Sequence, residues 1–124
     1  NMLYRYKKAF EKIAMGLLSF MPEEKNLKVL QQTIRIYENE DDWQLYLWKC
    51  EEDYIGLVGV EKQPEHWVVR HITVDPSHRG EGIGRQMLEA VAAEEACGEL
   101  VPCQIVQRYY DNVATKIAKE NAHL

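Results

Sequence analysis

Three segments rich in aromatic and β-branched residues follow one another between residues 43 and 74, and they constrain the fold more than any other feature of the chain. They read WQLYLWKC (43–50), YIGLVGVE (54–61) and WVVRHITV (67–74). Residues of these types favour strands. Only Glu51-Glu52-Asp53 separates the first two segments, which predicts an antiparallel hairpin. A connection containing Pro64 leads to the third strand, so a sheet is expected at the centre of the fold.

Apolar residues at helical spacing predict helices on either side of these strands. A first helix is expected over residues 8–21, stopped by Pro22, and a second over residues 26–38. A third is expected over residues 83–97 with Gly98 at its end, and a closing helix from Gln104 onward. The apolar faces of the first two comprise Phe10, Ile13, Ala14, Leu17, Leu18 and Met21, and then Leu27, Leu30, Ile34 and Tyr37.

The length and the order of these elements define the fold class. With short strands added at residues 2–6 and around Leu100, the order is β-α-α-β-β-β-α-β-α. This order indicates an α/β architecture with a mixed sheet. At 124 residues the chain is expected to be one domain spanning 1–124, because two cores of half that size would each be marginal.

Composition argues against several classes of function. The net charge of −5 disfavours a nucleic-acid partner, because such domains carry basic faces. Three cysteines without CxxC spacing and four histidines without an HExxH pattern give no support to a metal site, and they fit reduced thiols in a cytoplasm. No segment approaches the roughly 20 apolar residues that span a bilayer. We therefore expect no metal, no membrane and a cytoplasmic protein.

The third strand runs directly into VDPSHRGEGIGR (residues 74–85), a glycine-rich turn that precedes a predicted helix. The first N–H groups of a helix lack partners, and the helix dipole favours negative charge there. Glycines let the backbone come close to phosphate oxygens. A P-loop is excluded because Arg85-Gln86 follows the last glycine where Lys-Ser/Thr is needed. A dinucleotide fingerprint is excluded because it needs Gly or Ala where Arg85 stands.

The motif Arg-x-x-Gly-x-Gly at residues 79–84 resembles the acetyl-CoA loop of the GNAT-type N-acetyltransferases. The similarity extends upstream over HITVDPSHRGEGIG and downstream to YYDN (109–112), and the order of elements agrees over nearly the whole chain. The resemblance implies a GNAT-like α/β fold with a mixed, mostly antiparallel sheet flanked by helices. It also implies acetyl-CoA as cosubstrate.

The resemblance further implies which residues hold the donor. The pyrophosphate of CoA is expected on the backbone N–H groups of Gly80, Glu81, Gly82, Ile83 and Gly84, with positive charge from Arg79 and Arg85. Glu81 departs from the family, which usually has a basic or neutral residue there. Its carboxylate would repel phosphate unless the side chain points to solvent. The backbone of Ile72, Thr73 and Val74 is expected to pair with the pantetheine amides, while the strand beyond it separates from this one.

Acetyl transfer to an amine requires a base, a polarised carbonyl and a protonated leaving thiolate. Glu61 and His71 are the candidates for the base, and the N–H near Val74 is the candidate that polarises the carbonyl. Tyr110 aligns with the family's tyrosine that protonates the thiolate, with Tyr109 as the alternative register. The structural alternatives are a surface charge at the strand end for Glu61, a hydrogen-bonded sheet residue for His71 and a packed core residue for Tyr110.

The resemblance leads to two hypotheses about function. The first is an N-acetyltransferase acting on a primary amine of a small molecule or of a protein. The second is a CoA-binding regulatory module without turnover. The N-terminal RYKKAFEKIAMGLLSFMP and RHITVDPSHRGEGIG are most similar to family members encoded with riboflavin biosynthesis genes. The family usually continues through two further strands where this sequence ends in VATKIAKENAHL. A sheet shortened at the C-terminus follows, with an acceptor site that is open, completed by a homodimer partner, or lost.

Overall fold

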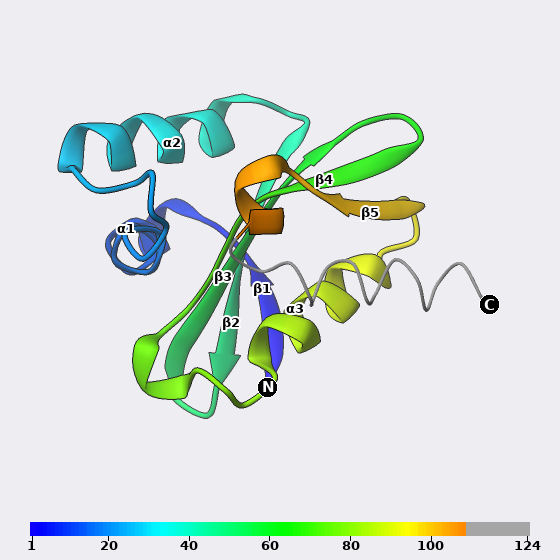
Figure 1. Ribbon diagram of the computed structural model, residues 1–124. Coiled ribbons are helices and arrows are strands. Elements are labelled where there is room, and N and C mark those ends of the chain that lie inside the picture. The colour runs from blue at the N-terminus through cyan, green and yellow to red at the C-terminus, as the bar shows by residue number, and fades with distance from the viewer. Residues whose placement is uncertain (109–124) are drawn as a thin grey trace.

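The computed structural model describes residues 1–108 of the chain, and a five-stranded sheet lies at its centre (Figure 1). The strands are β1 (Met2–Arg5), β2 (Trp43–Cys50), β3 (Asp53–Lys62), β4 (His66–Val74) and β5 (Glu99–Pro102). Their spatial order is β1-β2-β3-β4-β5. The first three pairings are antiparallel and β4 pairs with β5 in parallel. The predicted mixed, mostly antiparallel sheet is confirmed.

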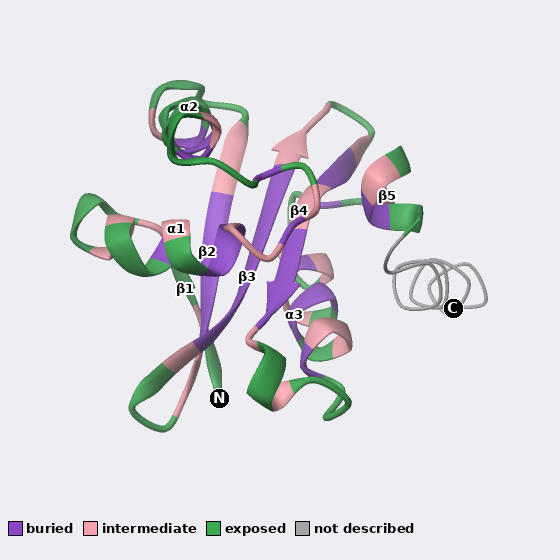
Figure 2. Ribbon diagram, turned by 60° about the vertical axis from the view of Figure 1, so that its left-hand side comes forward, coloured by how far each residue is buried: buried purple, intermediate pink, exposed green. Residues whose placement is uncertain are grey.

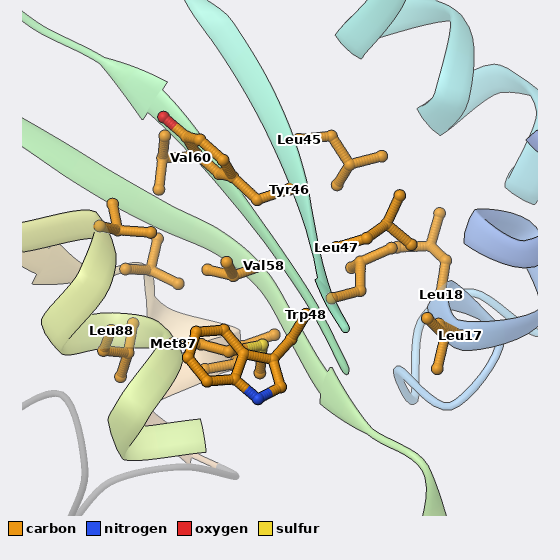
Figure 3. Packing of buried hydrophobic residues seen from close by; sticks show 14 of the residues in the cluster. Leu17, Leu18, Leu45, Tyr46, Leu47, Trp48, Val58, Val60, Met87 and Leu88 are labelled. Atoms are coloured by element: carbon orange, nitrogen blue, oxygen red, sulfur yellow. The ribbon is translucent and has the colours of Figure 1, made fainter. Parts of the chain in front are cut away.

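The predicted hairpin forms between β2 and β3. Glu51 has a positive φ of 57° at the turn, and Tyr46 lies opposite Val58 in the register. Because side chains alternate along a strand, Leu45 and Leu47 point to one face of the sheet while Tyr46 and Trp48 point to the other (Figure 3). Both faces of this hairpin are buried, as the near-continuous apolar run in each strand predicts.

Helices cover the two faces of the sheet. A 3₁₀ turn, η1 (Lys8–Phe10), leads into α1 (Glu11–Leu18), which lies on the same face as α2 (Leu27–Asn39), while α3 (Ile83–Ala92) lies on the opposite face (Figure 1). Leu17 and Leu18 approach Leu47 on the first face, and Met87 and Leu88 pack on the other (Figure 3). The core therefore extends on both faces of the sheet, and buried residues lie in the strands and in the helices on either side (Figure 2).

The first two helices differ from the predicted ranges at their ends. The helix α1 ends at Leu18, before Pro22, and α2 begins after Asn26. Asn26 caps α2 by accepting a hydrogen bond at its Oδ1 atom from the N–H of Val29 at 2.9 Å, as its position before the apolar pattern suggests. Leu27 is 61% exposed, because the first turn of α2 projects beyond the sheet. Ile13 is 40% exposed, because the buried stripe of α1 runs through Ala14, Leu17 and Leu18.

The third helix is shorter than its periodicity predicts. It ends at Ala92, and turns occupy the residues before Gly98. Gly98 has a positive φ of 62° and directs the chain into β5, so it does not cap the helix. After Pro102 the chain becomes helical again over residues 104–108. The rest of the predicted closing helix lies outside the described residues.

Candidate functional site

The edge of β4 that faces β5 is paired over only half of its length. The parallel ladder ends where Val69 lies opposite Pro102. Pro102 has no N–H to continue the ladder. Beyond the ladder, the N–H of Cys103 donates to the carbonyl of Val69 at 3.0 Å, and the thiol of Cys103 donates to the carbonyl of Arg70 at 3.8 Å. Within residues 1–108, no strand accompanies residues 70–74 on this side.

A β-bulge marks the same point on the opposite edge of β4. Gly59 lies opposite His71 and Val60 lies opposite Val69, so Arg70 is an extra residue in β4. A bulge bends its strand and increases the local twist. The bend falls where β5 departs, and it separates the paired half of β4 from the unpaired half.

The backbone of the unpaired half offers hydrogen-bonding groups to a ligand. The N–H of Asp75 donates to the carbonyl of Ile55 at 2.8 Å, which fixes the direction of that peptide group toward β3. Because peptide groups alternate along a strand, those of Ile72 and Val74 point to the open edge, and that of Thr73 points to β3. Two of the three predicted strand residues therefore present their backbone to the open edge.

The turn after β4 is held by a short side chain. Asp75 accepts two hydrogen bonds from Ser77, one from its N–H at 2.9 Å and one from its hydroxyl at 2.7 Å. These bonds, above all the one from the hydroxyl, lower the pKa of the Asp75 carboxyl. A 3₁₀ turn, η2 (Pro76–His78), follows and delivers the chain to the glycines.

Gly80 and Gly82 are required by the backbone of this loop. Their φ angles are 83° and 79°, in the left-handed region that disfavours side chains. A Cβ atom on either would meet nothing within 4 Å. These glycines therefore serve the loop conformation and leave open space in front of it.

The loop ends at the N-terminus of α3. Gly82 is the N-cap, and the first helical hydrogen bond runs from the N–H of Gln86 to its carbonyl at 3.0 Å. The N–H groups of Ile83 and Gly84 precede that bond and point out of the helix end. A hollow of about 330 Å³ lies here, lined by Val74, His78, Arg79, Gly80, Gly82, Ile83, Gly84 and Arg85. The combination of N–H groups and open volume suits an anion.

Charged side chains surround this hollow. The Nε atom of Arg79 donates to the carbonyl of Val74 at 3.2 Å, and its guanidinium lies 5.8 Å from the ring centre of Phe20. Arg85 forms an ion pair with Glu89 at 3.0 Å. Glu81 is exposed to solvent, the arrangement in which its charge interferes least with an anion. Both predicted arginines therefore line the hollow.

The two candidate bases have different surroundings. Glu61 accepts a hydrogen bond from the Nε atom of Arg70 at 3.0 Å, and the same guanidinium lies 5.6 Å from the ring centre of Trp43. His71 belongs to the unpaired half of β4, and both of its ring nitrogens have partners. The Nδ1 atom lies 2.6 Å from the hydroxyl of Tyr37, and the Nε2 atom lies 3.1 Å from the Oε1 atom of Glu24.

Three residues of this network carried no functional signal in the sequence. Glu24 is only 5% exposed and also accepts a hydrogen bond from the hydroxyl of Thr33 at 2.8 Å. Tyr37 belongs to the predicted apolar face of α2, and burial raises the pKa of its hydroxyl well above the usual value. Glu24 follows Pro22 in a short connection, where an acidic residue normally faces solvent. Tyr109 and Tyr110 lie outside the described residues.

Within residues 1–108, no group of three or more His, Cys, Asp or Glu side chains could hold a metal ion. None of the helices over the same residues combines the length and apolar character that a membrane crossing needs.

Solved structures share this arrangement. The aminoglycoside N-acetyltransferase AAC(6')-Iy in complex with CoA superposes with a TM-score of 0.75, over 94% of this chain and 85% of its own, at 14% identity. The aminoglycoside 6'-N-acetyltransferase of Acinetobacter haemolyticus superposes with a TM-score of 0.72, over 95% of this chain and 89% of its own, at 15% identity. At such identities these similarities show the fold.

Sequence comparison identifies the family as well as the fold. An uncharacterized N-acetyltransferase encoded in the lysA 3' region of Bacillus methanolicus is 61% identical over 102 residues, which cover 82% of this chain and 85% of that protein. The model of the acetyltransferase (GNAT) family matches residues 10–111. The chain belongs to the GNAT acetyltransferase family. As an acetyltransferase of this family it uses acetyl-CoA, and the hollow, the free helix N–H groups and the open edge of β4 fit that molecule.

Proposed function

We propose that this acetyltransferase moves the acetyl group of acetyl-CoA to a primary amine of a small molecule or of a protein. The observation that carries the proposal is the continuity between two features of the donor site. The unpaired half of β4 leads directly into the glycine loop and the N-terminus of α3. An extended ligand with a phosphate-bearing end matches such a path.

The donor would be held mainly by backbone groups. We assign the pyrophosphate to the N–H groups of residues 80–84, with Arg79 and Arg85 supplying positive charge. The pantetheine amides would pair with the peptide groups of Ile72 and Val74. Since Arg79 now bonds to the Val74 carbonyl, it has to release that carbonyl when a pantetheine amide takes its place. Acetyl-CoA supplies an activated acyl group, and the residues here orient it.

Three side chains and one backbone group are proposed for the chemistry. A backbone N–H near Val74, on the unpaired half of β4, would polarise the thioester carbonyl. His71 is the better placed of the two candidate bases, because it lies on the unpaired half of β4, and it would act through the buried carboxylate that it contacts, whereas the charge of Glu61 is balanced by Arg70. Tyr110 would return a proton to the leaving thiolate, with Tyr109 as the alternative.

The acceptor is proposed as a class. Two of the structural relatives are named as aminoglycoside acetyltransferases, whose acceptors are small amines. The proposal has three further parts. It includes a link to riboflavin metabolism, from the resemblance to family members encoded with riboflavin biosynthesis genes. It also includes completion of the acceptor site by a homodimer partner and a cytoplasmic location.

Mass spectrometry of reaction mixtures tests the proposal. The chain is incubated with acetyl-CoA and a panel of polyamines, amino acids, aminoglycosides and lysine-bearing peptides. The expected result is a product heavier by one acetyl group, formed more slowly by Tyr110→Phe. If acetyl-CoA binds and no amine in the panel is acetylated, turnover is absent and the alternative of a CoA-binding module replaces this one.

A further inference from the structure

Glu24 is a buried carboxylate with one oxygen satisfied and the other not. It lies in the connection between α1 and α2, and its Oε1 atom accepts hydrogen bonds from the hydroxyl of Thr33 and the Nε2 atom of His71. The Oε2 atom is fully covered, and it has no hydrogen-bond partner among residues 1–108. Buried carboxylate oxygens are normally paired, so an unpaired one marks a position for a donor.

The charge of Glu24 is also incompletely balanced. Over the described part of the chain, its only ion-pair partner within 4.0 Å is His71. Less deeply buried carboxylates of this chain, such as Glu11 and Glu38, each have Lys8 and Arg35 beside them. A buried carboxylate with less compensation than a surface one costs free energy, and proteins keep such groups where function needs them.

The network has one consistent arrangement of protons when His71 is neutral. A carboxylate only accepts hydrogen bonds, so the Nε2 atom of His71 must carry the proton that points to Glu24. Nδ1 is then the acceptor, and the hydroxyl of Tyr37 donates to it. With both ring nitrogens engaged, His71 has no free nitrogen for a substrate amine.

Glu24 and Tyr37 contact different nitrogens of the His71 ring. The hydroxyl of Tyr37 lies directly over Gly59 of β3, next to the Nδ1 atom of His71. The Nε2 atom is the one that faces Glu24. The connection that carries Glu24 crosses in front of β3 and β4 (Figure 2), and Phe20 in the same connection contacts Arg79 beyond the end of β4. The connection therefore runs along the unpaired half of β4.

We propose that Glu24 is the group that binds the ammonium of the acceptor and takes its proton, with His71 and Tyr37 holding the carboxylate in place. The inference rests on the proposed function and specifies its acceptor as a basic amine that arrives charged. Because Oε2 is covered, the connection over residues 19–26 has to shift to admit the amine.

The ammonium gives one proton to the Oε2 atom of Glu24, which frees the nitrogen lone pair. The nitrogen forms a bond to the thioester carbonyl carbon, and the carbon–sulfur bond breaks with its electron pair on sulfur. The thiolate takes the hydroxyl proton of Tyr110, the proposed acid, and leaves as a thiol, while the second nitrogen proton restores the Tyr110 hydroxyl. The carboxylic acid of Glu24 returns its proton to solvent.

Kinetics with two probe amines test the role of Glu24. The first, n-butylamine, is an ammonium at neutral pH, and the second, hydroxylamine, is mostly uncharged. Glu24→Gln should lower kcat/KM for n-butylamine by at least about 100-fold and for hydroxylamine by only a few-fold, since the uncharged amine needs no base for its first step. Equal losses on both amines, or no loss on either, would overturn the proposal.

Two control variants separate Glu24 from other carboxylates. Glu61→Gln removes the competing candidate base. Glu38→Gln removes a carboxylate that also accepts a hydrogen bond from a hydroxyl, that of Tyr6 at 2.7 Å. Both variants should keep the ratio of kcat/KM for n-butylamine to kcat/KM for hydroxylamine at its value in the unmodified chain. A change of that ratio in Glu61→Gln and not in Glu24→Gln would assign the base to Glu61.

A binding measurement tests the inference without turnover. NMR signals of the His71 ring are followed while n-butylammonium is added to the unmodified chain in the absence of acetyl-CoA. The expected result is a saturable shift of the Nε2 signal, absent in Glu24→Gln. No shift in the unmodified chain contradicts the inference even if amines are acetylated. A shift without any acetylation supports the ammonium site and refutes the proposed enzyme function.

Discussion

The phenol ring of Tyr37 fills the space directly above Gly59, and its hydroxyl reaches the Nδ1 atom of His71 on the neighbouring strand at 2.6 Å. A Cβ atom on Gly59 would overlap that hydroxyl. The glycine therefore allows α2 to approach the sheet closely enough for a helix residue to bond to β4. This relationship connects the packing of α2 with the position of the His71 ring.

Gly59→Ala should destabilise the fold by about 1–3 kcal/mol, because the added methyl group displaces the Tyr37 ring from a packed position. Urea unfolding measures the change in the free energy of unfolding. Gly16→Ala is the matched control, since a Cβ atom there meets nothing within 4 Å and alanine favours the α1 helix by roughly 0.5–1 kcal/mol. Equal stability of Gly59→Ala and the unmodified chain would contradict the close contact.

Tyr37→Phe should cost about 1–3 kcal/mol of stability, because it leaves the half-buried His71 ring without its hydroxyl partner. The affinity for acetyl-CoA should stay unchanged, since Tyr37 does not line the hollow. Thermal unfolding and calorimetry report the two quantities. Tyr4→Phe, on the exposed strand β1, is the control and should change stability by less than about 0.5 kcal/mol.

Cys97 should resist alkylation while the chain is folded. Burial, and secondarily the charge of Glu94, raise the pKa of its thiol from 9.0 to about 11, so at pH 8 the reactive thiolate is about 100-fold scarcer than in the unfolded chain. Peptide mapping after iodoacetamide treatment should show Cys50 and Cys103 modified and Cys97 modified only in denaturant. Rapid labelling of Cys97 in the native protein would contradict its burial.

The same shift predicts a loss of stability in alkali. Between pH 9 and 11 the folded chain keeps the Cys97 proton that the unfolded chain has lost, so raising the pH favours unfolding. Burial also raises the pKa of Tyr6 and Tyr46, which extends the effect in the same direction. The urea midpoint of the unmodified chain should fall steadily from pH 8 to 11. The midpoint of Cys97→Ala should fall less steeply over the lower part of this range.

Arg79→Ala should weaken acetyl-CoA binding roughly tenfold, equivalent to about 1.4 kcal/mol, through the loss of a positive charge at the hollow. Its affinity should also depend less on salt, because fewer ionic contacts are screened. Calorimetry at low and high sodium chloride compares it with Arg35→Ala, an arginine of α2 that pairs with Glu11 and Glu38. An unchanged affinity and salt dependence would remove Arg79 from the site.

The strands and the glycine loop could be predicted because their signals are local. Aromatic and β-branched residues identify β2, β3 and β4 within one or two residues of their ends. The loop is identifiable because Gly80 and Gly82 need left-handed backbone and have open space before them. Pro102 marks the end of β5, which is where the paired part of β4 ends.

The network around His71 could not be predicted, because its members come together only in the folded chain. Glu24 and His71 are 47 positions apart, and Tyr37 and His71 are 34 apart. An acidic residue after Pro22 has the local character of a solvated turn, and Tyr37 has that of a core residue. The length of α3 was overestimated for a related reason, since apolar periodicity continues past Ala92 while the chain turns toward β5.

Binding of acetyl-CoA at the glycine loop before α3 is the central claim about this protein. Gly84 is a sharper position to test than Gly82, where the φ of 79° would strain any other residue. A Cβ atom on Gly84 meets only the Ile72 side chain, at 3.9 Å, so Gly84→Asp should fold. Its carboxylate would stand at the N-terminus of α3, where an anion is favourable for the helix and occupies the place of the phosphate.

The decisive measurement is calorimetric titration of acetyl-CoA into the unmodified chain, Gly84→Asp and Gly16→Asp. Gly16→Asp is the matched control because the same substitution falls on an exposed helix position with open space. The account predicts one site in the unmodified chain and in Gly16→Asp, and at least about 100-fold weaker binding in a folded Gly84→Asp. Full affinity in folded Gly84→Asp, or no binding to the unmodified chain, would contradict the assignment of this loop as the acetyl-CoA site.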